Sequence, residues 1–128
     1  MIDHLGITVS DYLHARAFYE RVLGVLDHEV VMDVTKEQSG GYEGCGFGTS
    51  GKPTFWIGTG ETASTGVHVA FIAATRAAVD DFHAIALQHG ARDNGAPGLR
   101  PHYHPNYYGA FVIDLDGNNI EAVCHAPE

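Results

Sequence analysis

Residues 67–90 read VHVAFIAATRAAVDDFHAIALQHG and predict a strand followed by a helix. Within residues 67–72, large apolar side chains alternate with His68 and Ala70, which is the pattern of a half-buried strand. The helix is predicted over residues 77–89, where apolar residues recur with the spacing of one helical face: Val79, Phe82, Ala86 and Leu87. Thr75 has a side chain suited to cap its start, and Gly90 is expected to end it.

The same pattern is present near the start of the chain. Residues 4–9 predict a strand, Ser10 a helix cap, and residues 11–23 a helix. Three landmarks repeat at a near-constant offset: His4 and His68 are 64 residues apart, Phe18 and Phe82 are also 64 apart, and Gly24 and Gly90 are 66 apart. Such a repeat indicates that one supersecondary unit is used twice.

Apolar runs broken by turn residues follow each helix and predict antiparallel strands. These runs cover residues 26–34, 44–49 and 54–57 in the first half, and residues 109–114 and 119–124 in the second. The predicted fold is therefore a single α+β domain of two βαβββ modules with antiparallel-rich sheets. Module 1 is expected over about residues 1–58, a linker over 58–66 and module 2 over 67–128.

Two glycine-containing stretches lie outside these strands. Residues 38–48 predict a mobile loop or a bent strand. Residues 90–108 predict a long loop, in which an earlier strand of the second module is too weak to place. A loop of that length in a small domain is often functional.

Composition narrows the class of protein. Of the 128 residues, 45% are hydrophobic, and the formal net charge is -9. That balance disfavours nucleic acids and anionic membranes as partners. Two cysteines without a CxxC pair favour reduced thiols in the cytoplasm. No signal peptide or membrane-spanning run is found, so the expected partner is a small-molecule substrate.

The duplication also predicts a metal site. His4 and His68 occupy equivalent first strands. Glu121 lies four residues after Gly117 in the turn before the last strand, and Phe55 lies four residues after Gly51 in the matching turn. Three of these four equivalent positions therefore carry ligand side chains: His4, His68 and Glu121. Two imidazoles and a carboxylate bind Fe, Mn, Zn or Ni while leaving coordination positions open.

The chain resembles the vicinal oxygen chelate superfamily, which includes glyoxalase I, extradiol dioxygenases, fosfomycin-resistance enzymes and bleomycin-resistance proteins. The resemblance rests on four stretches: residues 3–7 (DHLGI), 17–24 (AFYERVLG), 67–71 (VHVAF) and 114–121 (DLDGNNIE). It implies paired βαβββ modules that curve into a cup, a homodimer, and a divalent metal held by His4, His68 and Glu121. That metal would chelate two adjacent oxygens of a carbonyl, enediolate or diol substrate.

The resemblance leaves the reaction open. Glyoxalase I would need a fourth ligand near Phe55, which neither Phe55 nor Trp56 supplies. The extradiol dioxygenase pattern fits the His, His, Glu set, but Phe111 stands where that family has Tyr, and Leu115 replaces its usual Pro. The alternatives are a lyase or isomerase, an extradiol-type dioxygenase, a fosfomycin-type thiol transferase, and a binding protein of the bleomycin-resistance type that performs no chemistry.

Residues 100–108, RPHYHPNYY, combine the side chains of a substrate pocket. The substrate-binding candidates are Arg100, as a fork donor to an anionic group, together with His102, Tyr107 and Phe55. The catalytic candidates are His104, as general acid or base, and Tyr108. The competing interpretation is a rigid, proline-bounded loop whose aromatic rings cover the edge of the sheet.

Overall fold

The polypeptide divides into two compact units. The computed structural model describes residues 1–128, and the division falls between unit 1, Met1–Ser64, and unit 2, Thr65–Glu128. This boundary lies inside the stretch 58–66 that is predicted as a linker.

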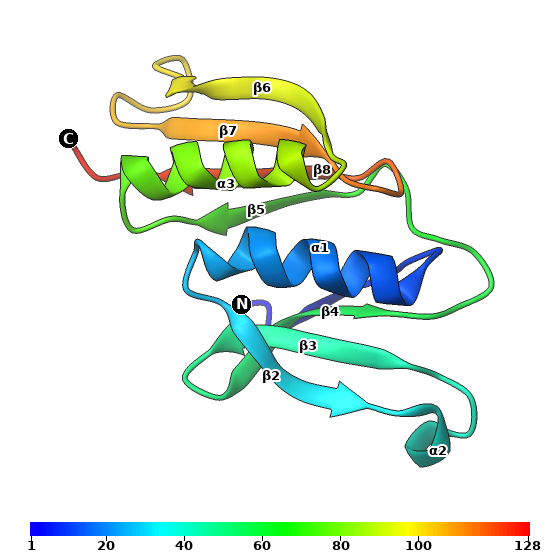
Figure 1. Ribbon diagram of the computed structural model, residues 1–128. Coiled ribbons are helices and arrows are strands. Elements are labelled where there is room, and N and C mark those ends of the chain that lie inside the picture. Colours follow the sequence, from blue (N-terminus) through cyan, green and yellow to red (C-terminus); the bar gives the residue numbers. More distant parts are fainter. The chain divides into compact units, whose positions relative to one another are not determined.

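Unit 1 is a four-stranded sheet with one long helix. Its elements follow the order β1 (Leu5–Thr8), α1 (Tyr12–Gly24), β2 (Glu29–Val34), α2 (Lys36–Ser39), β3 (Gly44–Thr49) and β4 (Lys52–Gly58). The strands lie in the order β1-β4-β3-β2 (Figure 1). Strand β1 runs parallel to β4, and the other pairs are antiparallel.

Unit 2 repeats this topology. Its elements are β5 (His68–Ile72), α3 (Arg76–Gln88), β6 (Arg92–Leu99), β7 (Tyr108–Ile113) and β8 (Asn119–Cys124). The strand order is β5-β8-β7-β6, with β5 parallel to β8 and the other pairs antiparallel. The predicted α+β class and the two βαβββ modules are therefore confirmed.

Helix α3 packs on one face of the unit 2 sheet (Figure 1). The residues at this contact are fully or almost fully buried: Val79, Phe82, Ala86, Ala110, Val112, Ile120 and Ala122. Thr75 caps the helix, because its side chain accepts a hydrogen bond from Ala78 N at 3.1 Å. In unit 1 the cap of α1 is Asp11, not the predicted Ser10, and its side chain accepts from His14 N.

The prediction of a long loop over residues 90–108 is wrong for the first half of that stretch, because β6 occupies Arg92–Leu99. This strand lies at the edge of the sheet, and its pairing with β7 is irregular between Asp93 and Gly95 and between Gly95 and Gly98. An edge strand with bulges tolerates proline and glycine and needs no regular apolar alternation. The periodicity by which strands are recognised is therefore absent from it.

One bulge changes the internal correspondence between the units. In the β3–β4 ladder, Phe47 pairs with Phe55 and Gly48 pairs with Pro53, so Thr54 is an extra residue on β4. A Cβ at Gly48 would lie 1.8 Å from the carbonyl oxygen of Lys52, and only glycine fits this close approach. The β7–β8 ladder has no such irregularity. Counting four residues from Gly51 and four from Gly117 therefore does not reach equivalent positions: the count in unit 1 stops one residue short.

No helix of the chain has both the length and the apolar character needed to cross a membrane.

Candidate metal and substrate site

Glu121 is the most deeply buried carboxylate of unit 2. It lies in β8, is 1% exposed, and points away from the face formed by its neighbours Ile120 and Ala122, which pack under α3. A buried carboxylate is costly unless it is paired. Its Oε1 lies 2.9 Å from His68 Nε2, and its Oε2 accepts a hydrogen bond from the Tyr107 hydroxyl.

The parallel pairing of β5 and β8 brings His68 to this carboxylate. Ala70 is the register partner of Glu121, and His68 lies two residues earlier on the same face of β5. The His68 side chain is 53% exposed, whereas the carboxylate is buried. The pair thus offers an imidazole nitrogen and a carboxylate oxygen side by side, with the imidazole toward solvent.

Tyr107 reaches Glu121 across a glycine. A Cβ at Gly109 would lie 3.1 Å from Tyr107 Cε1 and 3.4 Å from Glu121 Oε2. Burial, followed by the hydrogen bond to Glu121, raises the pKa of Tyr107 to about 12. The hydroxyl is therefore protonated at neutral pH and donates to Oε2.

His4 lies one residue before β1, so the predicted strand 4–9 is shorter than expected. Its Nδ1 lies 2.7 Å from Asp3 Oδ1, which also accepts from Lys52 Nζ at 2.7 Å. The hydrogen bonds from His4 and then from Lys52 hold the pKa of Asp3 below its ordinary value. If Nδ1–H donates to this carboxylate, the lone pair of the neutral imidazole is on Nε2. Carboxylates commonly orient metal-binding histidines in this way.

The donor chemistry of these residues fits a transition-metal ion. In unit 2 a histidine and a carboxylate have adjacent donor atoms, and in unit 1 a histidine is hydrogen-bonded to Asp3; imidazole nitrogen and carboxylate oxygen are both donors that such ions accept. Within either unit alone, no three His, Cys, Asp or Glu side chains are placed to hold a metal. Asp3 is a further candidate, as the residue that orients His4. The sequence patterns do not single it out, although its place directly before a predicted metal ligand is a signal that could have done so.

Trp56, not Phe55, is the structural equivalent of Glu121. Ala70 pairs with Glu121 in unit 2, and Gly6, the equivalent of Ala70, pairs with Trp56 in unit 1. Phe55 is 2% exposed and its ring packs against Tyr19 at 5.3 Å. Phe55, a predicted substrate contact, is therefore a core residue of unit 1 beneath α1. The extra residue Thr54 in the bulge explains the shift.

Arg100 lies close to the His68–Glu121 pair but is engaged locally. Its Nη1 and Nη2 each donate a 2.8 Å hydrogen bond, to the carbonyls of Gly98 and Ala96 respectively, and its guanidinium stacks at 5.4 Å over Phe111. The centroid of the Phe111 ring also lies 6.3 Å from that of the His68 ring. Two of its five N–H donors are used, so part of the fork is left for an anionic group.

The aromatic and histidine residues after Arg100 form one cluster. Successive ring contacts link His102 to Tyr103 at 4.1 Å, Tyr103 to Tyr107 at 5.0 Å, Tyr107 to His125 at 5.2 Å, and His125 to His104 at 5.6 Å. His104 Nδ1 accepts a hydrogen bond from Asn106 N at 3.1 Å. Neutral His104 therefore carries its proton on Nε2. The structure brings three predicted residues, His102, His104 and Tyr107, into one cluster that reaches Glu121.

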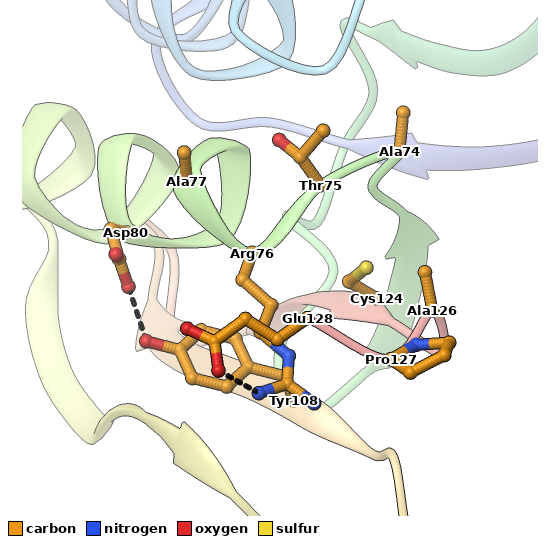
Figure 2. Close-up of a pocket in the computed structure, with 10 residues that line it drawn as sticks. All are labelled: Ala74, Thr75, Arg76, Ala77, Asp80, Tyr108, Cys124, Ala126, Pro127 and Glu128. Carbon is orange, nitrogen blue, oxygen red and sulfur yellow. Dashed lines mark hydrogen bonds and ion pairs between the residues drawn. The ribbon is translucent and has the colours of Figure 1, made fainter.

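Tyr108 is not part of that cluster. Its hydroxyl donates to Asp80 Oδ1 at 2.6 Å, on helix α3, and this bond is the main reason that its pKa is raised. It lines a cavity of about 480 Å³ beside the start of α3 (Figure 2). The structure thus separates Tyr108 from Glu121, because adjacent residues of a strand point to opposite faces.

Comparison with known families places the chain in a superfamily. Residues 1–122 match the model of the Glyoxalase/Bleomycin resistance protein/Dioxygenase superfamily. The chain belongs to this superfamily. No curated protein sequence matches the chain significantly.

Solved members of the glyoxalase superfamily share the fold over nearly the whole chain. A glyoxalase/bleomycin resistance protein from Albidiferax ferrireducens T118 is 26% identical, with a TM-score of 0.80 and 99% of each chain covered. A fosfomycin resistance protein, FosX, from Listeria monocytogenes, solved as a mutant with Mn(II) and dihydroxypropylphosphonic acid, is 16% identical, with a TM-score of 0.69 over 96% of this chain and 90% of that one. A glyoxalase I mutant from Zea mays is 20% identical, with a TM-score of 0.68. The match covers 95% of this chain and 46% of that one. At these last two identities the likeness concerns the fold alone.

Proposed function

We propose that the chain is a metal-dependent enzyme that acts on a small substrate with two adjacent oxygens, such as a carbonyl, enediolate or diol. The observation that carries the proposal is the contact of His68 Nε2 with Glu121 Oε1 at 2.9 Å, on neighbouring strands, with the carboxylate buried. An imidazole and a carboxylate in contact are two members of the ligand set predicted from the duplication. Membership of the superfamily supports the same interpretation.

His4, His68 and Glu121 are the proposed ligands of one divalent ion of the Fe, Mn, Zn or Ni type. When bound, such an ion supplies Lewis-acid polarisation of the substrate oxygens. Trp56 has no ligand atom, so no fourth protein ligand comes from the position equivalent to Glu121. Substrate or water would complete the shell.

The remaining roles belong to the cluster beside Glu121. Arg100 would bind an anionic group of the substrate with its unused N–H donors, and His102 would line the same space. His104 would transfer a proton through Nε2, because Nδ1 is occupied by Asn106 N–H. Tyr107 would hold Glu121 Oε2, and Tyr108 is left out of this site because its hydroxyl bonds Asp80.

The test is metal content and turnover together. We expect the purified protein to carry or take up one divalent ion per site, and His4→Ala, His68→Ala and Glu121→Gln each to lose it while the fold is kept. Turnover of small carbonyl and diol substrates by the loaded protein would support an enzyme. Metal binding without turnover of any such substrate, but with tight binding of a small molecule, would favour the alternative of a resistance-type binding protein. Metal-dependent addition of a thiol would favour a fosfomycin-type transferase.

We further propose that the protein forms a homodimer, as the family resemblance implies. Sedimentation at micromolar concentration should give twice the mass of 13.8 kDa, and a monomer under those conditions would contradict the proposal.

A further inference from the structure

The cavity beside the start of α3 is separate from the His68–Glu121 pair. Its volume is about 480 Å³, which falls in the range of small-molecule sites. Small side chains form much of its wall: Ala74, Ala77, Ala126 and Pro127. Three charged residues, Arg76, Asp80 and Glu128, also line it (Figure 2).

Arg76 is the unusual residue of this cavity, because its guanidinium makes no hydrogen bond. The side chain is only 20% exposed, and its Nε is fully buried without a partner. Its nearest acid is Glu128, whose Oε2 lies 3.9 Å from Nη1, too far for a hydrogen bond. The guanidinium stacks at 5.2 Å over the Tyr108 ring. A buried Nε–H without an acceptor is costly, and a carboxylate can accept from Nε and Nη of one guanidinium at the same time.

The two carboxylates of the cavity do not meet this need. Asp80 is engaged by the Tyr108 hydroxyl at 2.6 Å. Glu128 is 91% exposed and is oriented toward Arg76 without reaching it. It therefore marks where a carboxylate is attracted and would be displaced by one that fits closely.

We propose that this cavity binds a small organic carboxylate. The Arg76 guanidinium receives the anionic group, and the alanine and proline wall and the Tyr108 ring contact the apolar body. Glu128 competes for the same guanidinium. This inference does not rest on the metal site, because no lining residue is a proposed metal ligand.

The test is calorimetric titration of the full chain with propionate, benzoate and, separately, inorganic phosphate. We expect both carboxylates to bind, with Arg76→Gln weakening binding at least about tenfold. Glu128→Gln should tighten it several-fold, because a competitor is removed. Arg92→Gln is the matched control, since Arg92 is an exposed arginine of the same unit, and should bind as the wild type does.

Ala77→Leu keeps the proposal testable if Arg76→Gln fails to fold. Ala77 is exposed on α3, where leucine is a good helix former, and the larger side chain would fill the cavity without changing Arg76. Loss of carboxylate binding in this variant is expected. No binding by either the wild type or Glu128→Gln, unchanged binding in Ala77→Leu, or tighter binding of phosphate than of both carboxylates would overturn the proposal.

Discussion

The hydroxyls of Tyr107 and Tyr108, adjacent in sequence, bond carboxylates on opposite faces of one sheet. Tyr107 donates to Glu121 on β8, and Tyr108 donates to Asp80 on α3. Each tyrosine has a raised pKa and remains a donor at neutral pH. Only Tyr107 touches a proposed metal ligand. Comparing variants of the two tyrosines therefore tests whether the hydrogen bond to Glu121 affects metal binding.

Tyr107→Phe should weaken divalent metal binding about tenfold, because partners of a ligating carboxylate typically contribute at least that much to affinity. The substitution removes the hydrogen bond to Oε2 and leaves the ring in place. Titration with Zn²⁺ or Mn²⁺ followed by calorimetry measures the effect.

Tyr108→Phe is the control for that measurement. It also removes one tyrosine–carboxylate hydrogen bond, but the partner is Asp80. Its metal affinity should equal that of the wild type. Equal losses in the two variants would show that the effect is structural and not specific to Glu121.

Gly109→Ala should reproduce the Tyr107→Phe effect without changing the tyrosine. The new Cβ would crowd the Tyr107 ring at 3.1 Å and Glu121 Oε2 at 3.4 Å, so the hydroxyl would be displaced from the carboxylate. Gly24→Ala is the comparison, since no atom lies within 4 Å of the added Cβ. Metal affinity unchanged in Gly109→Ala would argue that Tyr107 adapts without losing its bond.

Asp3→Asn should lower metal affinity about tenfold, because it removes the carboxylate that accepts from His4 Nδ1. Lys52→Met is the control: Lys52 bonds the same Asp3 oxygen but does not touch the His4 ring. Its effect on metal affinity should be several-fold smaller. A larger loss in Lys52→Met than in Asp3→Asn would contradict the orienting role of Asp3.

The parts of the fold that follow regular periodicity could be predicted from the sequence. Strands β3 and β8 begin and end where the apolar runs do, and Thr75 caps α3 as its side chain predicts. Irregular elements could not be predicted. β6 is an edge strand with two bulges and a proline, so it lacks the alternation by which strands are recognised.

The same reason limits what could be predicted of the site. His68 and Glu121 meet because both of their strands are regular. Counting from the turn gives Phe55 the position that Trp56 holds, because Thr54 adds a residue that no local pattern reveals. The sequence does not assign Tyr107 and Tyr108 to faces, since the predicted strand begins at residue 109 and the observed strand at Tyr108, and a shift of one residue reverses the face.

Phe82→Ala should destabilise the chain by about 3–5 kcal/mol, because Phe82 is fully buried between α3 and its sheet and its removal leaves a cavity. Urea unfolding followed by circular dichroism measures the change. His68→Ala, in the same unit, is the comparison: its half-exposed ring lies outside that core, and Glu121 keeps the Tyr107 hydroxyl as a partner, so its effect on unfolding should be smaller. This contrast separates a core residue, Phe82, from a proposed metal ligand, His68. If His68→Ala unfolded as readily as Phe82→Ala, the loss of metal expected in that variant would be a consequence of unfolding and could not be assigned to the missing ligand.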